Sequence, residues 1–120
     1  MSVIHNTALA DAKAICTSAE SQVDINRCAV DRFEEADLRL NDLYNTKLAN
    51  LKRDENKRRL TDSQNAWILF RDKACTYEAG QVAAGSMYPM FYNNCLGRIT
   101  AQRVEDLKGY LVCDDNGCPR

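Results

Sequence analysis

The sequence is poor in histidine, glycine and proline and lacks the common catalytic and metal-binding motifs. Its 120 residues include one histidine, His5, with five glycines and two prolines. A Ser-His or Cys-His nucleophilic site would therefore depend on His5 alone. The sequence also has no glycine-rich phosphate loop, no H-E-x-x-H motif and no EF-hand loop. We therefore expect a protein that is not an enzyme and that holds no metal ion or cofactor.

Long apolar segments and an excess of one charge are also absent. No apolar stretch approaches the roughly 20 residues that a membrane-spanning helix requires, and the formal net charge is −1. The most basic stretch, residues 52–59, is interrupted by Asp54 and Glu55 and contains no aromatic residue that could stack on bases. These features predict no transmembrane segment and no nucleic-acid partner.

Cysteine, in contrast, is abundant. Six cysteines lie at positions 16, 28, 75, 95, 113 and 118, and the closest pair encloses four residues. Zinc sites and redox motifs usually contain cysteine pairs separated by two residues, which this sequence lacks. Six cysteines in a small domain are instead typical of three disulfides in an oxidising compartment. The sequence therefore predicts a periplasmic or secreted protein.

The start of the sequence does not show how such a protein would be exported. Residues 1–14 lack the charged start and the apolar run of a signal peptide. We therefore expect that the export signal has been removed from this sequence. A reduced cytosolic protein with six free thiols is the alternative, and counting the free thiols of unreduced protein distinguishes the two.

Three helical stretches account for most of the chain. Apolar residues recur at steps of three or four over residues 24–51, 58–79 and 89–110, which is the spacing of one helical face. Residues 52–57 are charged and predict a solvated connection between the first two helices. Ser21, three residues before Asp24, is typical of a capping box at the start of the first helix.

The sequence predicts an all-α fold: three main antiparallel helices in a small disulfide-linked bundle. A short helical segment is expected over residues 8–15 and an irregular polar tail over residues 111–120. Residues 1–120 are expected to form a single domain with its helical core over residues 8–110. The second and third helices should bury the following apolar residues: Leu60, Trp67, Phe70, Ala74 and Tyr77, then Phe91, Cys95, Ile99, Val104 and Leu107.

Short connections make consecutive helices antiparallel neighbours, so the hairpins predict specific contacts. If the first hairpin turns near Asp54, paired residue numbers sum to about 108. Asp37 then lies beside Arg71, and Tyr44 lies beside Gln64. These polar residues on the apolar stripes admit a catalytic interpretation. A structural one is favoured, because a buried arginine persists when it is paired with a carboxylate.

The second hairpin predicts a disulfide. If it turns near Gly85, Cys75 lies opposite Cys95, and Trp67 lies near Arg103, where a cation–π contact is expected. The remaining cysteines are then expected to pair as Cys16–Cys28 and Cys113–Cys118. The first pair would tie the N-terminal segment to the first helix, and the second would close a small loop in the tail.

Several motifs resemble one known family. In chain order they are Asn26-Arg27-Cys28, Ala36-Asp37-x-x-Leu40-Asn41-x-x-Tyr44, Gln64-x-x-Trp67-x-x-Phe70-Arg71-Asp72-x-x-Cys75, Cys95, and Thr100-x-x-Arg103-x-x-x-Leu107. Together they are similar to the LprI-type lysozyme inhibitor domain of small secreted or lipid-anchored bacterial proteins. Phe70 stands where that family often has tyrosine, and Cys113 and Cys118 lie beyond its pattern.

The resemblance implies an all-helical, disulfide-linked domain of the bacterial envelope that binds and blocks lysozyme. The family motifs fall between the expected helices, so they report the fold rather than a binding surface. The alternative function is a non-inhibitory envelope module that binds another protein or serves as an accessory unit. A contiguous apolar patch on the helices would favour that alternative.

Candidate partner-binding residues lie in two expected loops. They are Gln81, Ser86 and Tyr88 in the loop before the third helix, and Asp114 and Asp115 in the tail. A tyrosine supplies rigid contact area at interfaces, although Tyr88 could equally cover the end of the core. The acidic pair would suit a basic lysozyme, and a solvated tail is the alternative.

Overall fold

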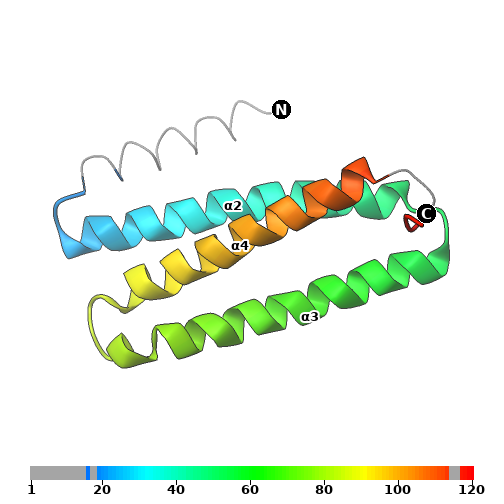
Figure 1. The fold of residues 1–120 in the computed structure, drawn as a ribbon. Helices are drawn as coiled ribbons and strands as arrows, with labels where there is room; N and C mark the ends of the chain where they lie inside the picture. The colour runs from blue at the N-terminus through cyan, green and yellow to red at the C-terminus, as the bar shows by residue number, and fades with distance from the viewer. Residues whose placement is uncertain (1–15, 17–18, 114–116) are drawn as a thin grey trace.

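The computed structural model describes residue 16 and residues 19–113 and 117–120, and three long helices dominate it (Figure 1). These are α2 (Gln22–Asn50), α3 (Asp54–Glu78) and α4 (Tyr88–Val112), with a short 3₁₀ helix η1 (Gly80–Val82) after α3. The described residues contain no strand. The predicted all-α, disulfide-linked fold is therefore confirmed. The helical segment expected over residues 8–15 lies outside the described residues.

Local signals explain where the helices begin. The Ser21 side chain caps α2, because its Oγ accepts a hydrogen bond from the Asp24 backbone N–H at 3.1 Å. The structure corrects the predicted start of the second helix, since α3 begins at Asp54 rather than residue 58. Asp54 and Glu55 lie in its first turn, where negative charge interacts favourably with the helix dipole. The charged run is therefore mostly helical.

The helices do not pack equally against one another. α4 lies along α2 and runs in the same direction, whereas α3 packs mainly on α4 and touches α2 at few points (Figure 1). α4 lies close to α2 at Gly97, where an added Cβ atom would make an ordinary contact of 3.6 Å with the Phe33 Cα. Consecutive helices are antiparallel, as predicted, but α2 and α3 share only a small interface.

Two small clusters form the core. The first contains Leu40, Val104 and Leu107, and the second contains Cys75, Cys95 and Leu96. Three side chains predicted to be inside are instead exposed: Phe70 is 62% exposed, Tyr77 is 86% exposed and Phe91 is 43% exposed. For Phe70 and Tyr77 the reason is geometric, because α3 packs mainly on α4 and buries only a narrow stripe.

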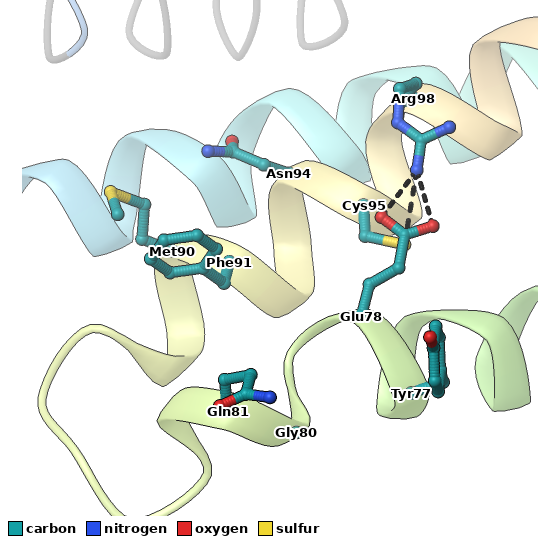
Figure 2. A pocket seen from close by; sticks show the side chains of 9 residues that line it. All are labelled: Tyr77, Glu78, Gly80, Gln81, Met90, Phe91, Asn94, Cys95 and Arg98. Carbon is teal, nitrogen blue, oxygen red and sulfur yellow. Dashed lines mark hydrogen bonds and ion pairs between the residues drawn. The ribbon is translucent and has the colours of Figure 1, made fainter.

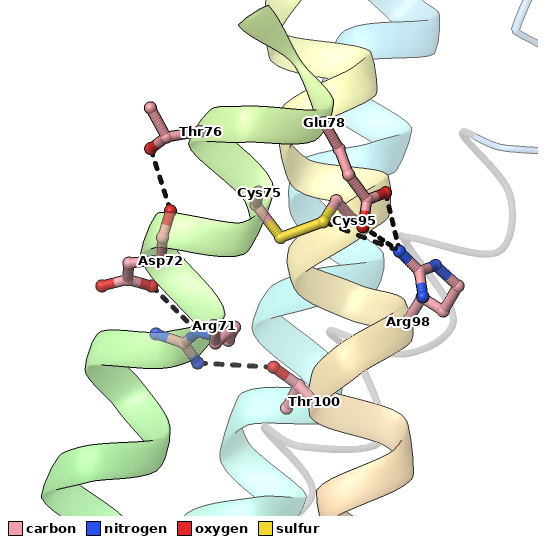
Figure 3. The surroundings of a disulfide bond; sticks show 8 residues. All are labelled: Arg71, Asp72, Cys75, Thr76, Glu78, Cys95, Arg98 and Thr100. Atoms are coloured by element: carbon pink, nitrogen blue, oxygen red, sulfur yellow. Dashed lines mark hydrogen bonds and ion pairs between the residues drawn. A yellow bond between two sulfur atoms is a disulfide. The ribbon is translucent and has the colours of Figure 1, made fainter.

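All six cysteines form disulfides, in the pairs expected from the sequence: Cys16–Cys28, Cys75–Cys95 and Cys113–Cys118. The Cys75–Cys95 bond joins α3 to α4 in the interior (Figure 3). The Cys113–Cys118 bond folds the tail back at the end of α4. Among the described helices, none is long and apolar enough to cross a membrane.

Candidate functional site: the α3–α4 loop and groove

The polar residues predicted to lie between the helices are centred on Arg71. Arg71 is buried, and its Nε donates to Asp72 Oδ1 at 3.0 Å. Its Nη1 donates to Thr100 Oγ1 at 3.3 Å and lies 3.5 Å from Asp37 Oδ1 (Figure 3 shows the Asp72 and Thr100 bonds). The expected Asp37 pairing is thus a single long contact, and Asp72 makes the shorter one.

A second buried arginine continues this arrangement. Arg103 Nε donates to Gln64 Oε1 and its Nη2 donates to Ser63 Oγ, both at 3.0 Å. Trp67 lies between the two arginines, with the Arg71 guanidinium carbon 5.1 Å and the Arg103 carbon 5.7 Å from its ring centroid. The cation–π contact expected between Trp67 and Arg103 is therefore present, and both arginines serve packing.

Tyr44 and Gln64 have different hydrogen-bond partners. The Tyr44 hydroxyl donates to Thr61 Oγ1 at 3.1 Å, while Gln64 accepts its hydrogen bond from Arg103. Gln64 is buried and turned toward α4, because α3 packs on that helix. Gln64, Arg71, Thr100 and Arg103 are buried and join the helices through these hydrogen bonds.

The loop between α3 and α4 is the more accessible candidate. Its turns are closed by backbone hydrogen bonds, including Gly85 N–H to the Val82 carbonyl at 2.9 Å and Tyr88 N–H to the Gly85 carbonyl at 3.2 Å. Asn26 on α2 donates from its side chain to the Ser86 carbonyl at 2.9 Å. The loop is thus held in one shape from both sides, and a pre-formed loop loses less conformational entropy on binding.

The predicted partner-binding residues differ in how exposed they are. Gln81 and Ser86 are exposed on the loop. Tyr88 is the first residue of α4, is half-buried, and stacks on Tyr92 with 5.3 Å between ring centroids. Tyr88 is therefore partly covered by a neighbouring ring of its own helix. Asp114 and Asp115 lie outside the described residues.

An open groove of about 930 Å³ runs beside the loop, between the end of α3 and the start of α4 (Figure 2). Its lining residues, called the α3–α4 groove below, are Tyr77, Glu78, Gly80, Gln81, Met90, Phe91, Asn94, Cys95 and Arg98. Gln81 is the only predicted partner-binding residue among them.

Charged and aromatic groups meet in the α3–α4 groove. Arg98 Nη2 on α4 lies 2.7 Å from Glu78 Oε1 on α3 and 2.8 Å from its Oε2, so an ion pair crosses the groove (Figure 2). Both side chains are about half exposed or more, at 62% for Arg98 and 46% for Glu78. Tyr77 and Phe91 add exposed rings on the two helices.

Sequence reasoning missed Tyr77, Phe91 and Arg98 as surface residues of a candidate site. The helical spacing assigned the two aromatic residues to the core, and Arg98 belonged to no motif. One signal was available: the apolar residues of the second helix occupy a wider arc than a helix with one main neighbour can bury.

One titratable group near the loop is perturbed. Tyr92 on α4 packs against the cluster formed by Cys75, Cys95 and Leu96. Burial, followed by the nearby Asp72 carboxylate, raises the pKa of the Tyr92 phenol above its ordinary value, because both disfavour the phenolate. This tyrosine is neutral at physiological pH and acts as a packing residue beneath Tyr88.

The fold and the site define a small, disulfide-linked helical domain with a pre-formed surface loop beside an open groove. The family model for the lysozyme inhibitor LprI matches residues 13–107, so the chain belongs to the LprI family, which is a family of inhibitors rather than of enzymes. The predicted resemblance is confirmed. The Cys113–Cys118 disulfide lies outside the matched residues.

A curated relative has no assigned function. The chain is 30% identical over 113 residues to the uncharacterized protein R02472 of Rhizobium meliloti (strain 1021), across 84% of this chain and 81% of that protein. No solved structure matches the chain. The three disulfides and the family fit an extracytoplasmic protein.

Proposed function

We propose that this protein is a periplasmic or secreted inhibitor that binds a lysozyme through the α3–α4 loop and the adjoining groove. Membership of the LprI family is the observation that carries the proposal. The geometry supports it, since the loop is exposed, pre-formed and located at one end of the bundle (Figure 1).

The loop has a suitable shape for entering a sugar-binding cleft. Residues 83–86 are two alanines, a glycine and a serine, so the end of the hairpin is narrow, and all four are exposed. The Cys75–Cys95 disulfide joins the two helices just below the loop. A narrow, rigid end enters a concave site with a small loss of conformational entropy.

The groove supplies chemistry that suits a glycan-cleaving enzyme. Such enzymes generally use two carboxyl groups at the cleavage point. Arg98 is an exposed cation of the groove, and its Nη2 donates to both carboxylate oxygens of Glu78. A carboxylate of the enzyme is therefore a compatible partner for Arg98, through a charge-assisted hydrogen bond.

Tyr77 and Phe91 are the proposed anchors on either side of Arg98. Interfaces draw most of their binding energy from a few large side chains, and aromatic residues are frequent among them. Tyr77 is 86% exposed in the unbound protein, so it has most of its surface available for burial in a complex.

The test is a titration of the oxidised protein into a panel of lysozymes of different types, with binding heat and cell-wall lysis measured together. We expect stoichiometric inhibition of at least one type. Tyr77→Ala should weaken binding at least about tenfold. The matched control is Leu69→Ala, which removes another exposed side chain of α3 that does not line the groove.

Two results would overturn the proposal in different ways. Equal weakening by Tyr77→Ala and Leu69→Ala would reject the groove as the binding surface. Failure of the folded protein to bind any lysozyme type would reject the inhibitor function itself.

A non-inhibitory envelope module is the second candidate, and one observation favours it. Phe70, Tyr77 and Phe91 are exposed large hydrophobic side chains that line the face where α3 meets α4. Exposed apolar surface of this kind marks protein-binding sites in general. Capture of an envelope protein that depends on Tyr77, without any effect on lysozyme, would support this candidate.

A further inference from the structure

A second cavity lies at the opposite end of the bundle from the α3–α4 loop. It has a volume of about 260 Å³ and lies where the end of α2, the start of α3 and the end of α4 meet the tail. None of its lining residues belongs to the α3–α4 groove. We propose that this cavity, called the tail pocket below, binds a small monocarboxylate with an apolar body.

The interior of the tail pocket is apolar and well supported. Leu51 and Leu60 line it and are 4% and 9% exposed. Tyr110 and Pro119 contribute further apolar surface. The tail that carries Pro119 is held in place, because the Arg120 carbonyl accepts hydrogen bonds from the Arg53 backbone N–H at 3.2 Å and from Asn56 Nδ2 at 2.8 Å.

The surroundings of the tail pocket carry positive charge that the described residues do not fully compensate. Lys47 lines the pocket, and its Nζ donates to the neutral Tyr110 carbonyl at 3.1 Å. Arg103 lies behind two lining residues, because it donates to Ser63 Oγ and its guanidinium carbon is 5.8 Å from the Tyr110 ring centroid. No described carboxylate forms an ion pair with either cation.

Arg103 is more deeply buried than Lys47. Arg103 is 7% exposed, and the two groups that accept its hydrogen bonds, Gln64 Oε1 and Ser63 Oγ, are both neutral. A buried cation without an anionic partner is costly, and an anion placed nearby offsets part of that cost. Arg59 is a third cation of the pocket, and it is only loosely paired, with Glu55 at 3.5 Å. The described cations at and behind the pocket, Lys47, Arg59 and Arg103, therefore favour a negatively charged ligand.

The volume sets the size of the ligand. An apolar cavity of about 150 Å³ accommodates benzene, so 260 Å³ accommodates a phenyl ring or a short acyl chain with a carboxylate attached. The ligand would have about ten non-hydrogen atoms. Its apolar part would lie against Leu51 and Leu60, and its carboxylate would face Lys47 and Arg59.

The experiment uses phenylpropanoate as the probe and its neutral analogue phenylpropanamide as the ligand control. Amide NMR spectra of the full chain are recorded during titration with each compound. We expect shifts for Leu60, Ser63 and Tyr110, which line the tail pocket. Phenylpropanoate should bind at least about tenfold more tightly than the amide. Equal affinity for the two compounds, or the absence of shifts at these residues, would overturn the proposal.

Protein variants provide an independent check. Lys47→Met and Arg59→Gln each remove a cation of the tail pocket, and each should weaken phenylpropanoate binding by about tenfold. Arg58→Gln is the matched control, because Arg58 is an exposed cation of the same helix that does not line the pocket. An equal effect of Arg58→Gln would show nonspecific attraction to positive charge and would contradict the proposed site.

Discussion

Removing the Cys75–Cys95 disulfide should destabilise the protein more than removing the disulfide of the tail. The perturbation is the double substitution Cys75→Ala and Cys95→Ala. Both cysteines are buried, at 0% and 4% exposure, and they pack with Leu96 in the second core cluster. Since α3 packs mainly on α4, this bond is the covalent link across the interface that holds α3.

The magnitude follows from the loop that the bond closes. The two cysteines are 20 positions apart, and the chain-entropy relation gives about 3.3 kcal/mol for a loop of that length. Cys113 and Cys118 are five positions apart, for which the same relation gives about 2.1 kcal/mol. Loss of buried sulfur atoms from the core adds to the first value. The Cys113 residue is exposed, so little packing is lost with the second bond.

The assay is urea unfolding of both double variants, monitored by circular dichroism, with hydrogen exchange to locate the effect. We expect the Cys75–Cys95 variant to lose at least about 1 kcal/mol more than the Cys113–Cys118 variant. Amides of α3 should exchange faster in the former, because α3 has few contacts with α2. Equal losses in the two variants, or faster exchange confined to α2, would refute the reasoning.

Three further predictions concern packing and pH. Gly97→Ala should stabilise the protein by about 0.5–1 kcal/mol in urea unfolding, because its Cβ would make an ordinary 3.6 Å contact with Phe33; a loss of stability would show that α2 and α4 leave no room there. Leu40→Ala should cost about 2–5 kcal/mol, since Leu40 is 1% exposed, whereas Leu38→Ala, at a position 48% exposed, is the control expected to cost far less. The pKa of the Tyr92 phenol is raised, so the folded state keeps this proton at a pH where the unfolded state loses it. The contribution of Tyr92 to the free energy of unfolding is therefore fully present below pH 10.0. It is lost as the pH rises through the pKa of Tyr92 in the folded state. Absorbance at the phenolate band should therefore show a titration step above pH 10.0, and Tyr92→Phe should remove both that step and the alkaline loss; persistence of the step in Tyr92→Phe would contradict the assignment.

The helices were predictable because their signals are local. Apolar spacing and the Ser21 cap depend on residues close together in the chain. The start of α3 was missed for a local reason as well: charged residues were assigned to a connection, although Asp54 and Glu55 are favourable in a first helical turn.

The candidate site was only partly predictable. The loop with Gln81 and Ser86 was located by its glycines, but the adjoining groove was not. Tyr77 and Phe91 have the spacing of core residues, and their exposure depends on which neighbour α3 has. The choice between α2 and α4 is made by long-range packing, which helical periodicity does not encode.

By itself, therefore, the sequence determined the helical class and the family, because composition, spacing and motifs are properties of one chain segment at a time. The prediction of the Cys75–Cys95 pair also required that the second and third helices fold back on each other. Only the tertiary structure decided that α4 packs on α2 while α3 lies mainly against α4. Among the described helices, that arrangement leaves one side of α3 without a neighbour and exposes Tyr77 beside Arg98. It also surrounds the tail pocket with Lys47, Arg59 and Arg103 from three different helices, and no local pattern could bring these cations together.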